Sequence, residues 1–257
     1  MPERDFSADP LAPVLDLPGV AEAAAAAGAA IAEVHRHRAN RRGFALSASE
    51  ASVRAARASA TLDGGAPELP ADDSDGAVGD PVLAGAVRVA AALDGPALVS
   101  TLTVWRRAPL QVLARLHVLA ATDLVDAATR GRPRQDAGVA QRLDLLAQLV
   151  TGGTRVPAAV LAAVVHGELL TLRPFGSADG VVARAASRLV AVSTGLDPKN
   201  LTVPEVSWMR SPAEYRTAAE GFAGGTVDGI AAWVLNCCAA LQAGAREATS
   251  IADAHST

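Results

Sequence analysis

Aromatic residues, cysteine and lysine are scarce in this sequence. Only 3% of the 257 residues are Phe, Trp or Tyr, and Lys199 is the single lysine. The two cysteines are the adjacent pair Cys237 and Cys238. Neighbouring cysteines with no partner elsewhere make neither a disulfide framework nor a zinc site with usable ligand spacing. We therefore expect both to be small, buried side chains of a helix.

A positive net charge, a secretion signal and a long apolar run are also lacking. The formal net charge is −4, which argues against a general affinity for nucleic acid or anionic lipid. The opening residues, MPERDFSADP, have neither the basic start nor the apolar core of a signal peptide. The longest strongly apolar run, residues 156–165, is shorter than the roughly 20 residues that span a bilayer. These features predict a cytoplasmic protein that binds neither nucleic acid nor membrane.

Hydrophobic residues make up half of the chain, and alanine-rich stretches with helical periodicity recur along it. The spacing predicts helices over residues 20–37, 47–62, 81–93, 109–121, 139–150, 157–172, 181–193, 212–222 and 226–249. Two capping boxes, Ser47 to Glu50 and Ser211 to Glu214, mark the starts of two of these helices. Residues 97–105 are β-branched enough to be either a helix or a short strand.

The chain is expected to divide into a helical N-terminal region, a linker and a helical core. Residues 64–80, GGAPELPADDSDGAVGD, are poor in large apolar groups and rich in Pro, Gly and Asp. This composition predicts an acidic flexible linker. The linker separates residues 1–63 from a core over residues 81–250, and residues 251–257 form a tail. The fold class is therefore all-α.

Between two predicted helices lies the stretch LRPFGSADGVVAR, residues 172–184. Its glycine-bracketed loop, Gly176 to Gly180, leads directly into a helix, and the N-terminus of a helix favours anions. Arg184 lies one turn into this helix and leans back toward the loop, because helical side chains tilt toward the N-terminus. Such an arrangement fits an anion of phosphate size, although turns of this kind are also common as plain connections.

Residues 173–184 resemble the signature of the Fic (Fido) family, H-P-F-x-D/E-G-N-G-R-x-x-R, without a gap. Four positions match the signature: Pro174, Phe175, Gly180 and Arg184. Five positions depart from it: Arg173 stands at the catalytic histidine, Ser177 at the metal-binding acid, Ala178 at the first glycine, Asp179 at the asparagine and Val181 at the first arginine. The resemblance implies a Fic-like helical bundle with an N-terminal helical extension. It also implies that residues 176–180 and Arg184 form a loop that binds the phosphates of ATP or another nucleotide.

Two further features agree with this resemblance. The segment Ser59-Ala-Thr-Leu-Asp63-Gly64 is similar to the family's inhibitory motif, S/T-x-x-x-E-G/N, with Asp in place of Glu, and it ends a predicted helix. His166 lies seven residues before Arg173, where the family commonly has a histidine. Without the resemblance, Ser59 and Asp63 are the polar side of a helix end, and His166 is a core residue that packs its helix. His117 is interpreted in the same way, as core packing.

The resemblance implies a protein that moves AMP from ATP to a protein hydroxyl, but the substitutions remove parts of that chemistry. Arginine at position 173 stays protonated and cannot serve as a general base. Serine at position 177 brings no negative charge for magnesium, so we expect weak magnesium binding and predict no metal ligands. Asp179 adds a negative charge to the loop and works against phosphate binding.

The leading hypothesis is therefore a degenerate Fic-domain protein, inactive as an adenylyltransferase, that binds a nucleotide, a protein partner or a second copy of itself. One alternative is an active nucleotidyl- or phosphotransferase with a different base and Arg173 as electrostatic stabiliser. The other is a helical protein-interaction module in which the loop is only a connector.

Overall fold

The computed structural model describes residues 9–68 and 78–255, and this part of the chain is helical, with no β-strand. The expected all-α fold class is thereby confirmed. In chain order the helices are α1 (Ala12–Leu15), α2 (Val20–Arg36), α3 (Arg38–Leu62), α4 (Pro81–Ala92), α5 (Gly95–Trp105), α6 (Pro109–Ala120), α7 (Ala137–Gln148), the π-helical turn η1 (Leu149–Gly153), α8 (Ala158–Leu172), α9 (Asp179–Ser193), α10 (Pro204–Arg210), α11 (Pro212–Ala223) and α12 (Val227–Ala254).

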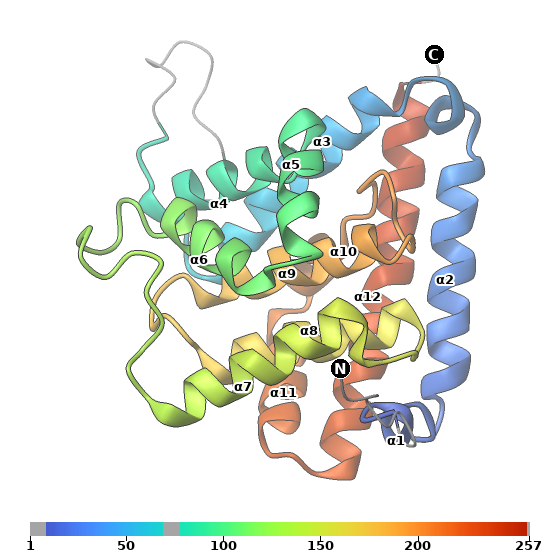
Figure 1. Cartoon of the computed structure of the whole chain (residues 1–257). Coiled ribbons are helices and arrows are strands. Elements are labelled where there is room, and N and C mark those ends of the chain that lie inside the picture. Colours follow the sequence, from blue (N-terminus) through green and yellow to red (C-terminus); the bar gives the residue numbers. More distant parts are fainter. Residues whose placement is uncertain (1–8, 69–77, 256–257) are drawn as a thin grey trace.

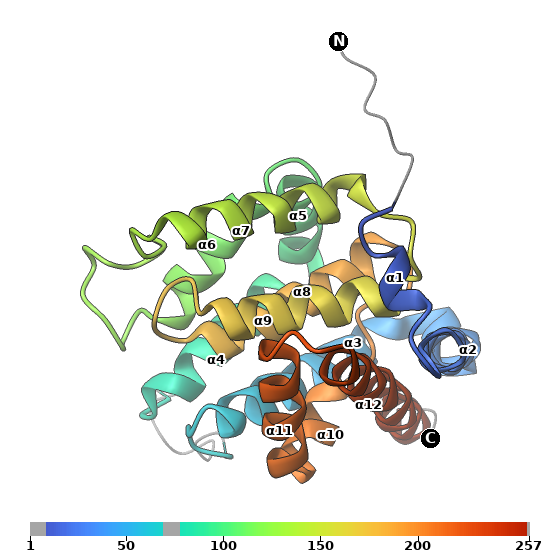
Figure 2. The ribbon, with the colours of Figure 1, turned by 90° about the horizontal axis from the view of Figure 1, so that it is seen from below.

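Helices α8 and α9 form a central hairpin that the other helices surround (Figures 1 and 2). Both are buried on nearly all sides, which explains why the α8 sequence is apolar without a polar face. One hydrophobic cluster packs the hairpin against α4, α6 and α7, and a second packs α8 against α2, α11 and α12. The loop that joins α8 to α9 is thus anchored by two helices fixed in the core.

Helices α2 and α12 run side by side along one edge of the molecule (Figure 1). Among the described residues, α12 is the single helix that is both long enough and apolar enough to cross a membrane. Its apolar face packs within the fold. Cys237 and Cys238 are buried in this helix, as expected. The helix also extends beyond the predicted end, and Ile251 and Ala252 are buried. Residues 251–254 therefore belong to α12 and are not part of a tail.

The predicted helix start at Ser47 is wrong. Helix α3 begins at Arg38, and its only interruption is the non-helical Gly43. Ser47 is buried inside the helix, and its hydroxyl caps nothing. At the second capping box, α11 begins at Pro212 as predicted, but the Ser211 side chain makes no cap hydrogen bond. The spacing of a capping box therefore located one helix start out of two.

Residues 97–105, ambiguous in the sequence, lie in helix α5. The Asp94 carboxylate caps the start of this helix, and Pro96 lies in its first turn, so local capping outweighs the β-branched composition. The short helix α10 was not predicted, because its seven residues are too few to show a period. Helix α7 ends in the π-helical turn η1, where Gly152 has a φ of 105°.

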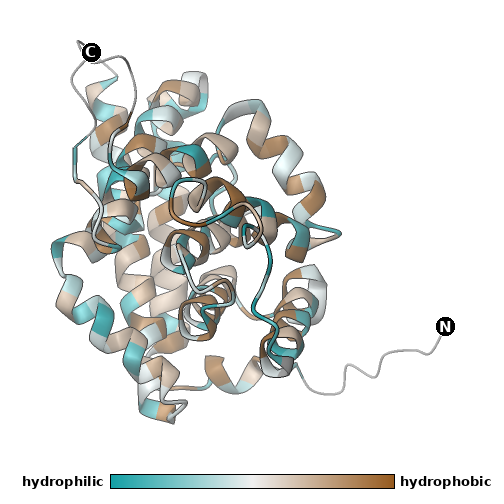
Figure 3. Ribbon diagram, turned by 90° about the vertical axis from the view of Figure 1, so that its left-hand side faces the viewer, coloured by the Kyte–Doolittle hydropathy of each residue, from teal (hydrophilic) through white to brown (hydrophobic). Residues whose placement is uncertain are grey.

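Residues 64–68 and 78–80, the described ends of the expected linker, are not helical, and residues 69–77 lie outside the described residues. The opening residues 1–8, on which the expectation about a secretion signal rests, lie outside them as well. In Figure 3 the helices carry hydrophilic and hydrophobic segments in alternation, as expected for helices with one buried and one exposed face. This view faces the side of the molecule where the α8–α9 loop and the end of α3 come together.

Candidate functional site

The loop between α8 and α9 reverses the chain through three residues in the left-handed region. Arg173, which caps the end of α8, has a φ of 45°, Gly176 has 77°, and Ala178, which precedes α9, has 50°. Glycine adopts this conformation freely, whereas a residue with a side chain adopts it at a cost of order 1–3 kcal/mol. Backbone strain of this kind is concentrated at functional sites.

The loop is held from inside by Asp179, the first residue of α9. Its Oδ1 accepts a hydrogen bond from the Phe175 backbone N–H at 2.9 Å, while Oδ2 is buried without a partner. Burial raises the pKa of the Asp179 carboxyl, although the hydrogen bond from the Phe175 backbone N–H and, to a smaller extent, the nearby Arg173 and Arg134 charges oppose this effect. The side chain therefore holds the loop in shape, and its buried position disfavours the ionised form of the carboxyl.

A neighbouring segment fastens the outer side of the loop. The Arg134 backbone N–H donates to the Pro174 carbonyl at 2.8 Å. The Arg134 guanidinium donates to the Arg173 carbonyl at 3.1 Å and to the Leu172 carbonyl at 2.9 Å. Three hydrogen bonds thus join residue 134 to the C-terminal end of α8, 38 to 40 positions later in the chain.

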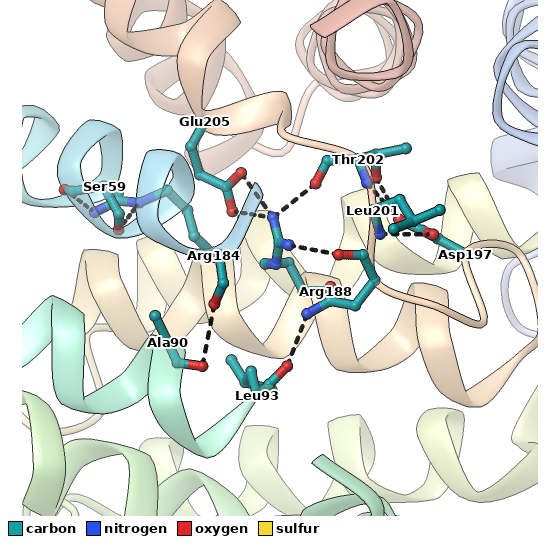
Figure 4. Close-up of polar contacts among 11 residues, drawn as sticks. Ser59, Ala90, Leu93, Arg184, Arg188, Asp197, Leu201, Thr202 and Glu205 are labelled. Carbon is teal, nitrogen blue, oxygen red and sulfur yellow. Dashed lines mark hydrogen bonds and ion pairs between the residues drawn. The ribbon is translucent and has the colours of Figure 1, made fainter. Parts of the chain in front are cut away.

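Arg184, the matching arginine of the signature, is buried and turned toward α3 (Figure 4). Its guanidinium donates to the Ser59 hydroxyl at 2.8 Å and to the Ser59 carbonyl at 2.9 Å, and it pairs with an Asp63 carboxylate oxygen at 2.8 Å. Burial opposes its charge, but the Asp63 carboxylate prevails and the pKa of Arg184 is raised. The structure thus brings together the three residues that the sequence comparison singled out on α3 and α9.

Gly64 fixes the end of α3 where Asp63 is placed. It has a φ of 84°, and the N–H groups of Gly64 and Gly65 donate to the carbonyls of Thr61 and Ala60. This is the Schellman closure of a helix, in which glycine takes the left-handed position. Asp63, the residue just before, is thereby held over the first turn of α9.

The Asp63 carboxylate lies directly against Gly180. A Cβ atom built on Gly180 would stand 2.4 Å from Oδ1 and 2.5 Å from Oδ2 of Asp63, closer than side chains approach. The first backbone N–H groups of a helix have no partner within it, and no side chain caps α9. The chain's own carboxylate therefore occupies the place where an anion would meet both the α9 N-terminus and Arg184.

A cavity of about 450 Å³ opens beside this contact. It is lined by Leu62, Asp63, Val82, Leu124, Leu170, Arg173, Ser177, Ala178, Asp179, Gly180, Arg184, Tyr215 and Arg216. Of the predicted site residues, Ser59 lies behind Arg184, Gly64 follows α3, and Gly176 is exposed outside the cavity lining. Arg216 was not predicted from sequence, because it has no place in the signature and faces the cavity only through the position of α11.

Tyr215 was likewise missed by the sequence interpretation, and it links Arg184 to His166. The Tyr215 hydroxyl accepts from the Arg184 guanidinium at 3.3 Å and lies 2.8 Å from Nε2 of His166. Since the hydroxyl proton then points to His166, this ring nitrogen is the acceptor. Burial, together with the charge of Arg184, lowers the pKa of His166 well below its usual range. His166 is a buried, neutral residue among Trp208, Tyr215 and Trp233, which agrees with its interpretation as core packing.

His117 is buried on α6, as expected, yet it also contacts the signature loop. Its ring stacks on Phe175 with 4.2 Å between ring centroids, and its Nε2 lies 3.0 Å from the Ser177 hydroxyl. The other ring nitrogen, Nδ1, accepts from the Gly131 backbone N–H at 2.8 Å. A neutral imidazole carries one proton, so Nε2 holds it and donates to Ser177. Nothing in the sequence pattern could reveal this contact, because 60 positions separate the two residues.

Magnesium, which the Fic-like signature implies, does not fit the residues present. The position of the metal-binding acid holds a serine, one Asp179 oxygen is bonded to the loop backbone, and Asp63 is paired with Arg184. Within the described residues no group of three or more His, Cys, Asp or Glu side chains could hold a metal ion. A hard cation needs several oxygen ligands, and charged carboxylates are the strongest of these.

The sequence matches no protein-family model and no curated protein sequence. The fold, in contrast, is similar to that of solved structures. One of them is a Fic family protein from Desulfovibrio desulfuricans G20, with a TM-score of 0.57 and 18% sequence identity over 91% of this chain and 74% of that chain. At this identity the likeness concerns the fold, and the chain therefore has a Fic-like fold.

Proposed function

We propose that this Fic-like domain binds a nucleotide or another phosphate-bearing ligand in the cavity beside the α8–α9 loop, and that it does not transfer AMP to protein hydroxyls. The observation that carries the proposal is the cavity lining: three arginines, Arg173, Arg184 and Arg216, line the same cavity as residues 179 and 180 in the first turn of α9. Guanidinium groups and unpaired backbone N–H groups are the donors that proteins use for phosphate.

The proposed lack of transfer rests on the replacement of the signature's catalytic histidine by Arg173. Arg173 keeps its proton, since guanidinium pKa values exceed about 12. Of the two nearby histidines, His117 directs an N–H at Ser177, and His166 accepts from Tyr215 away from the cavity. Loss of a general base alone typically lowers a rate by about 10² to 10⁴. The two carboxylates of the cavity lining are engaged, Asp63 with Arg184 and Asp179 with the Phe175 N–H, which weighs against an active transferase that uses another base.

Asp63 gives the proposed site a built-in competitor. Its carboxylate already pairs with Arg184 over the first turn of α9, so a phosphate that binds there displaces it. Ser59 and Gly64 support the same arrangement, Ser59 by holding Arg184 and Gly64 by closing α3. We therefore propose that α3 restrains ligand binding and acts as an inhibitory-type helix.

The test uses the full chain with radiolabelled ATP and, in parallel, calorimetry with ATP, ADP and GTP. We expect heat of binding but no covalent label on the protein, either in the unaltered chain or in Asp63→Ala. The double variant Arg173→His/Ser177→Asp returns a base and an acid to the loop and should gain measurable labelling. Val181 is left unchanged because its side chain is buried in the core. Strong labelling by the unaltered chain would overturn the proposed inactivity, and absence of heat with every nucleotide would overturn the proposed binding.

A further inference from the structure

Ser177 stands where the resemblance places a metal-binding acid, and its environment suits a different task. The residue lines the cavity. Its hydroxyl oxygen accepts a hydrogen bond from the Nε2–H group of His117, with 3.0 Å between the nitrogen and the oxygen. Because the oxygen accepts from His117, the hydroxyl proton is free for another acceptor. The serine thus faces the cavity as a hydrogen-bond donor.

The direction of this hydrogen bond is fixed by parts that cannot easily rearrange. His117 is buried on α6, its ring is stacked on Phe175, and its second nitrogen is occupied by the Gly131 backbone N–H. Burial lowers the pKa of the His117 imidazole, so the neutral ring with its proton on Nε2 is the form present at neutral pH. The other tautomer would set an Nδ1 proton against the Gly131 N–H and leave two donors facing each other.

The charges around Ser177 favour an anion without help from a metal. Arg173 and Arg216, which are exposed residues, line the cavity together with the buried Arg184. The carboxylate of Asp179 is bonded inward to the loop, and that of Asp63 is the group that a ligand would displace. A magnesium ion here would meet three arginines, and the two carboxylates of the lining are already engaged, Asp63 with Arg184 and Asp179 with the loop backbone.

We propose that the cavity binds a phosphate group without magnesium, with the Ser177 hydroxyl as a donor to a phosphate oxygen and His117 as the positioning residue that orients this hydroxyl. The inference rests on the proposed function, since it specifies how the same cavity holds its ligand. At the position where the signature has a metal-binding acid, this chain has a neutral hydrogen-bond donor. The ligand is therefore the free phosphate and not its magnesium complex.

The first experiment is calorimetry of the full chain with sodium triphosphate and with ATP, each in EDTA and in excess magnesium. We expect binding in EDTA that is as tight as, or tighter than, binding with magnesium, because magnesium neutralises phosphate charge that the arginines would meet. Binding that requires magnesium would overturn this inference while the proposed nucleotide binding stands. No binding under any condition would overturn both.

The second experiment is a double-mutant cycle on the same binding, in EDTA. Ser177→Ala should weaken triphosphate binding about tenfold, the size of one hydrogen bond to a charged group. His117→Phe keeps an aromatic ring on Phe175 but removes the donor, and it should weaken binding by a smaller factor. The double variant should bind no more weakly than Ser177→Ala alone, because His117 acts through Ser177.

Ser100→Ala, an exposed serine of α5 away from the cavity, is the matched control and should leave the affinity unchanged. Thermal unfolding of each variant verifies that it is folded before binding is compared. Unchanged affinity in Ser177→Ala, or effects of the two single changes that simply add, would overturn the assigned roles.

Discussion

Asp63 and Arg184 show how a single carboxylate can both stabilise a fold and block a site. The Arg184 side chain is 1% exposed, whereas that of Asp63 is 24% exposed. Removal of the carboxylate leaves a buried guanidinium with only Ser59 and Tyr215 as partners. The partial exposure of Asp63 reduces the loss below that of a fully buried pair.

Asp63→Ala should therefore lower the free energy of unfolding by about 1–3 kcal/mol. Sodium triphosphate should raise the melting temperature of this variant more than that of the unaltered chain, because the ligand takes the place of the missing carboxylate. Differential scanning calorimetry measures both effects. Asp123→Ala, which breaks the exposed pair with Arg88, is the control and should change stability by less than about 1 kcal/mol. A variant that is as stable as the unaltered chain would show that the pair contributes nothing.

Asp179 is the second residue whose charge affects stability. Here the negative charge destabilises the fold, whereas that of Asp63 stabilises it. Its folded-state pKa is raised by burial, so the stability it contributes is fully present below its unfolded pKa and is lost as the pH rises through the folded pKa. At neutral pH the ionised form is a burden on the fold. Asparagine, the residue of the Fic signature, keeps the acceptor for the Phe175 N–H without the charge.

Asp179→Asn should raise stability at pH 7 by about 1 kcal/mol, which is roughly 2–4 °C in melting temperature for a chain of this size. The gain should shrink as the pH falls through the raised pKa, because Asp179 then becomes protonated. Thermal unfolding at pH 7 and pH 4 measures this. The exposed Asp144→Asn is the control. A lower melting temperature of Asp179→Asn than of the unaltered chain at pH 7 would contradict the destabilising effect of the ionised Asp179.

At the scale of elements, the contact between α3 and the α8–α9 loop depends on one missing side chain. The Asp63 carboxylate lies 2.4 Å from where a Cβ of Gly180 would be. A methyl group there forces the end of α3 away from α9, whereas the charges of Asp63 and Arg184 are retained. The helix contact can thus be loosened without change to the groups that bind the ligand.

Gly180→Ala should therefore resemble Asp63→Ala in two respects: lower stability, and a larger rise of melting temperature with triphosphate. Hydrogen exchange of the last turn of α3 should become faster, because this turn loses its contact. Gly79→Ala, where a Cβ would meet nothing within 4 Å, is the matched control. If Gly180→Ala exchanges and binds like the unaltered chain, the end of α3 does not restrain the site.

At the scale of the whole molecule, a buried ion pair connects α9 to α10. Arg188 pairs with Glu205 at 3.1 Å and also donates to the carbonyls of Thr202 and Asn200, and the Asn200 amide reaches the Leu93 carbonyl at 2.9 Å (Figure 4). The pair fixes one end of α9 while the loop fixes the other. Both side chains are buried, so little water reaches either charge as an alternative partner.

Loss of one partner should destabilise the entire fold. Glu205→Leu leaves the Arg188 charge buried and should cost about 3–5 kcal/mol. The double variant Arg188→Met/Glu205→Leu removes both charges and should recover much of this loss, because two apolar side chains can pack where the pair was. Chemical denaturation of the two variants measures the difference. A double variant less stable than Glu205→Leu would show that the pair itself is a large net stabiliser.

The sequence by itself determined most of the helices and the position of the loop between α8 and α9. Periodicity, prolines and glycines act within a few residues of one another, and these local rules remain valid in the folded chain. They failed at Ser47, where burial against the core continued a helix that the capping box was expected to start. They also missed α10, which is too short to show a period.

Only the tertiary structure decided which distant residues meet at the site. Asp63 lies over Gly180, His117 donates to Ser177, and Tyr215 and Arg216 reach the cavity from α11. The inhibitory-type motif implied that Asp63 could pair with an arginine of the signature such as Arg184, but a pattern in the chain gives no distance between them. The physical reason is that such contacts depend on how helices pack across the core, which many side chains settle together and no local spacing encodes.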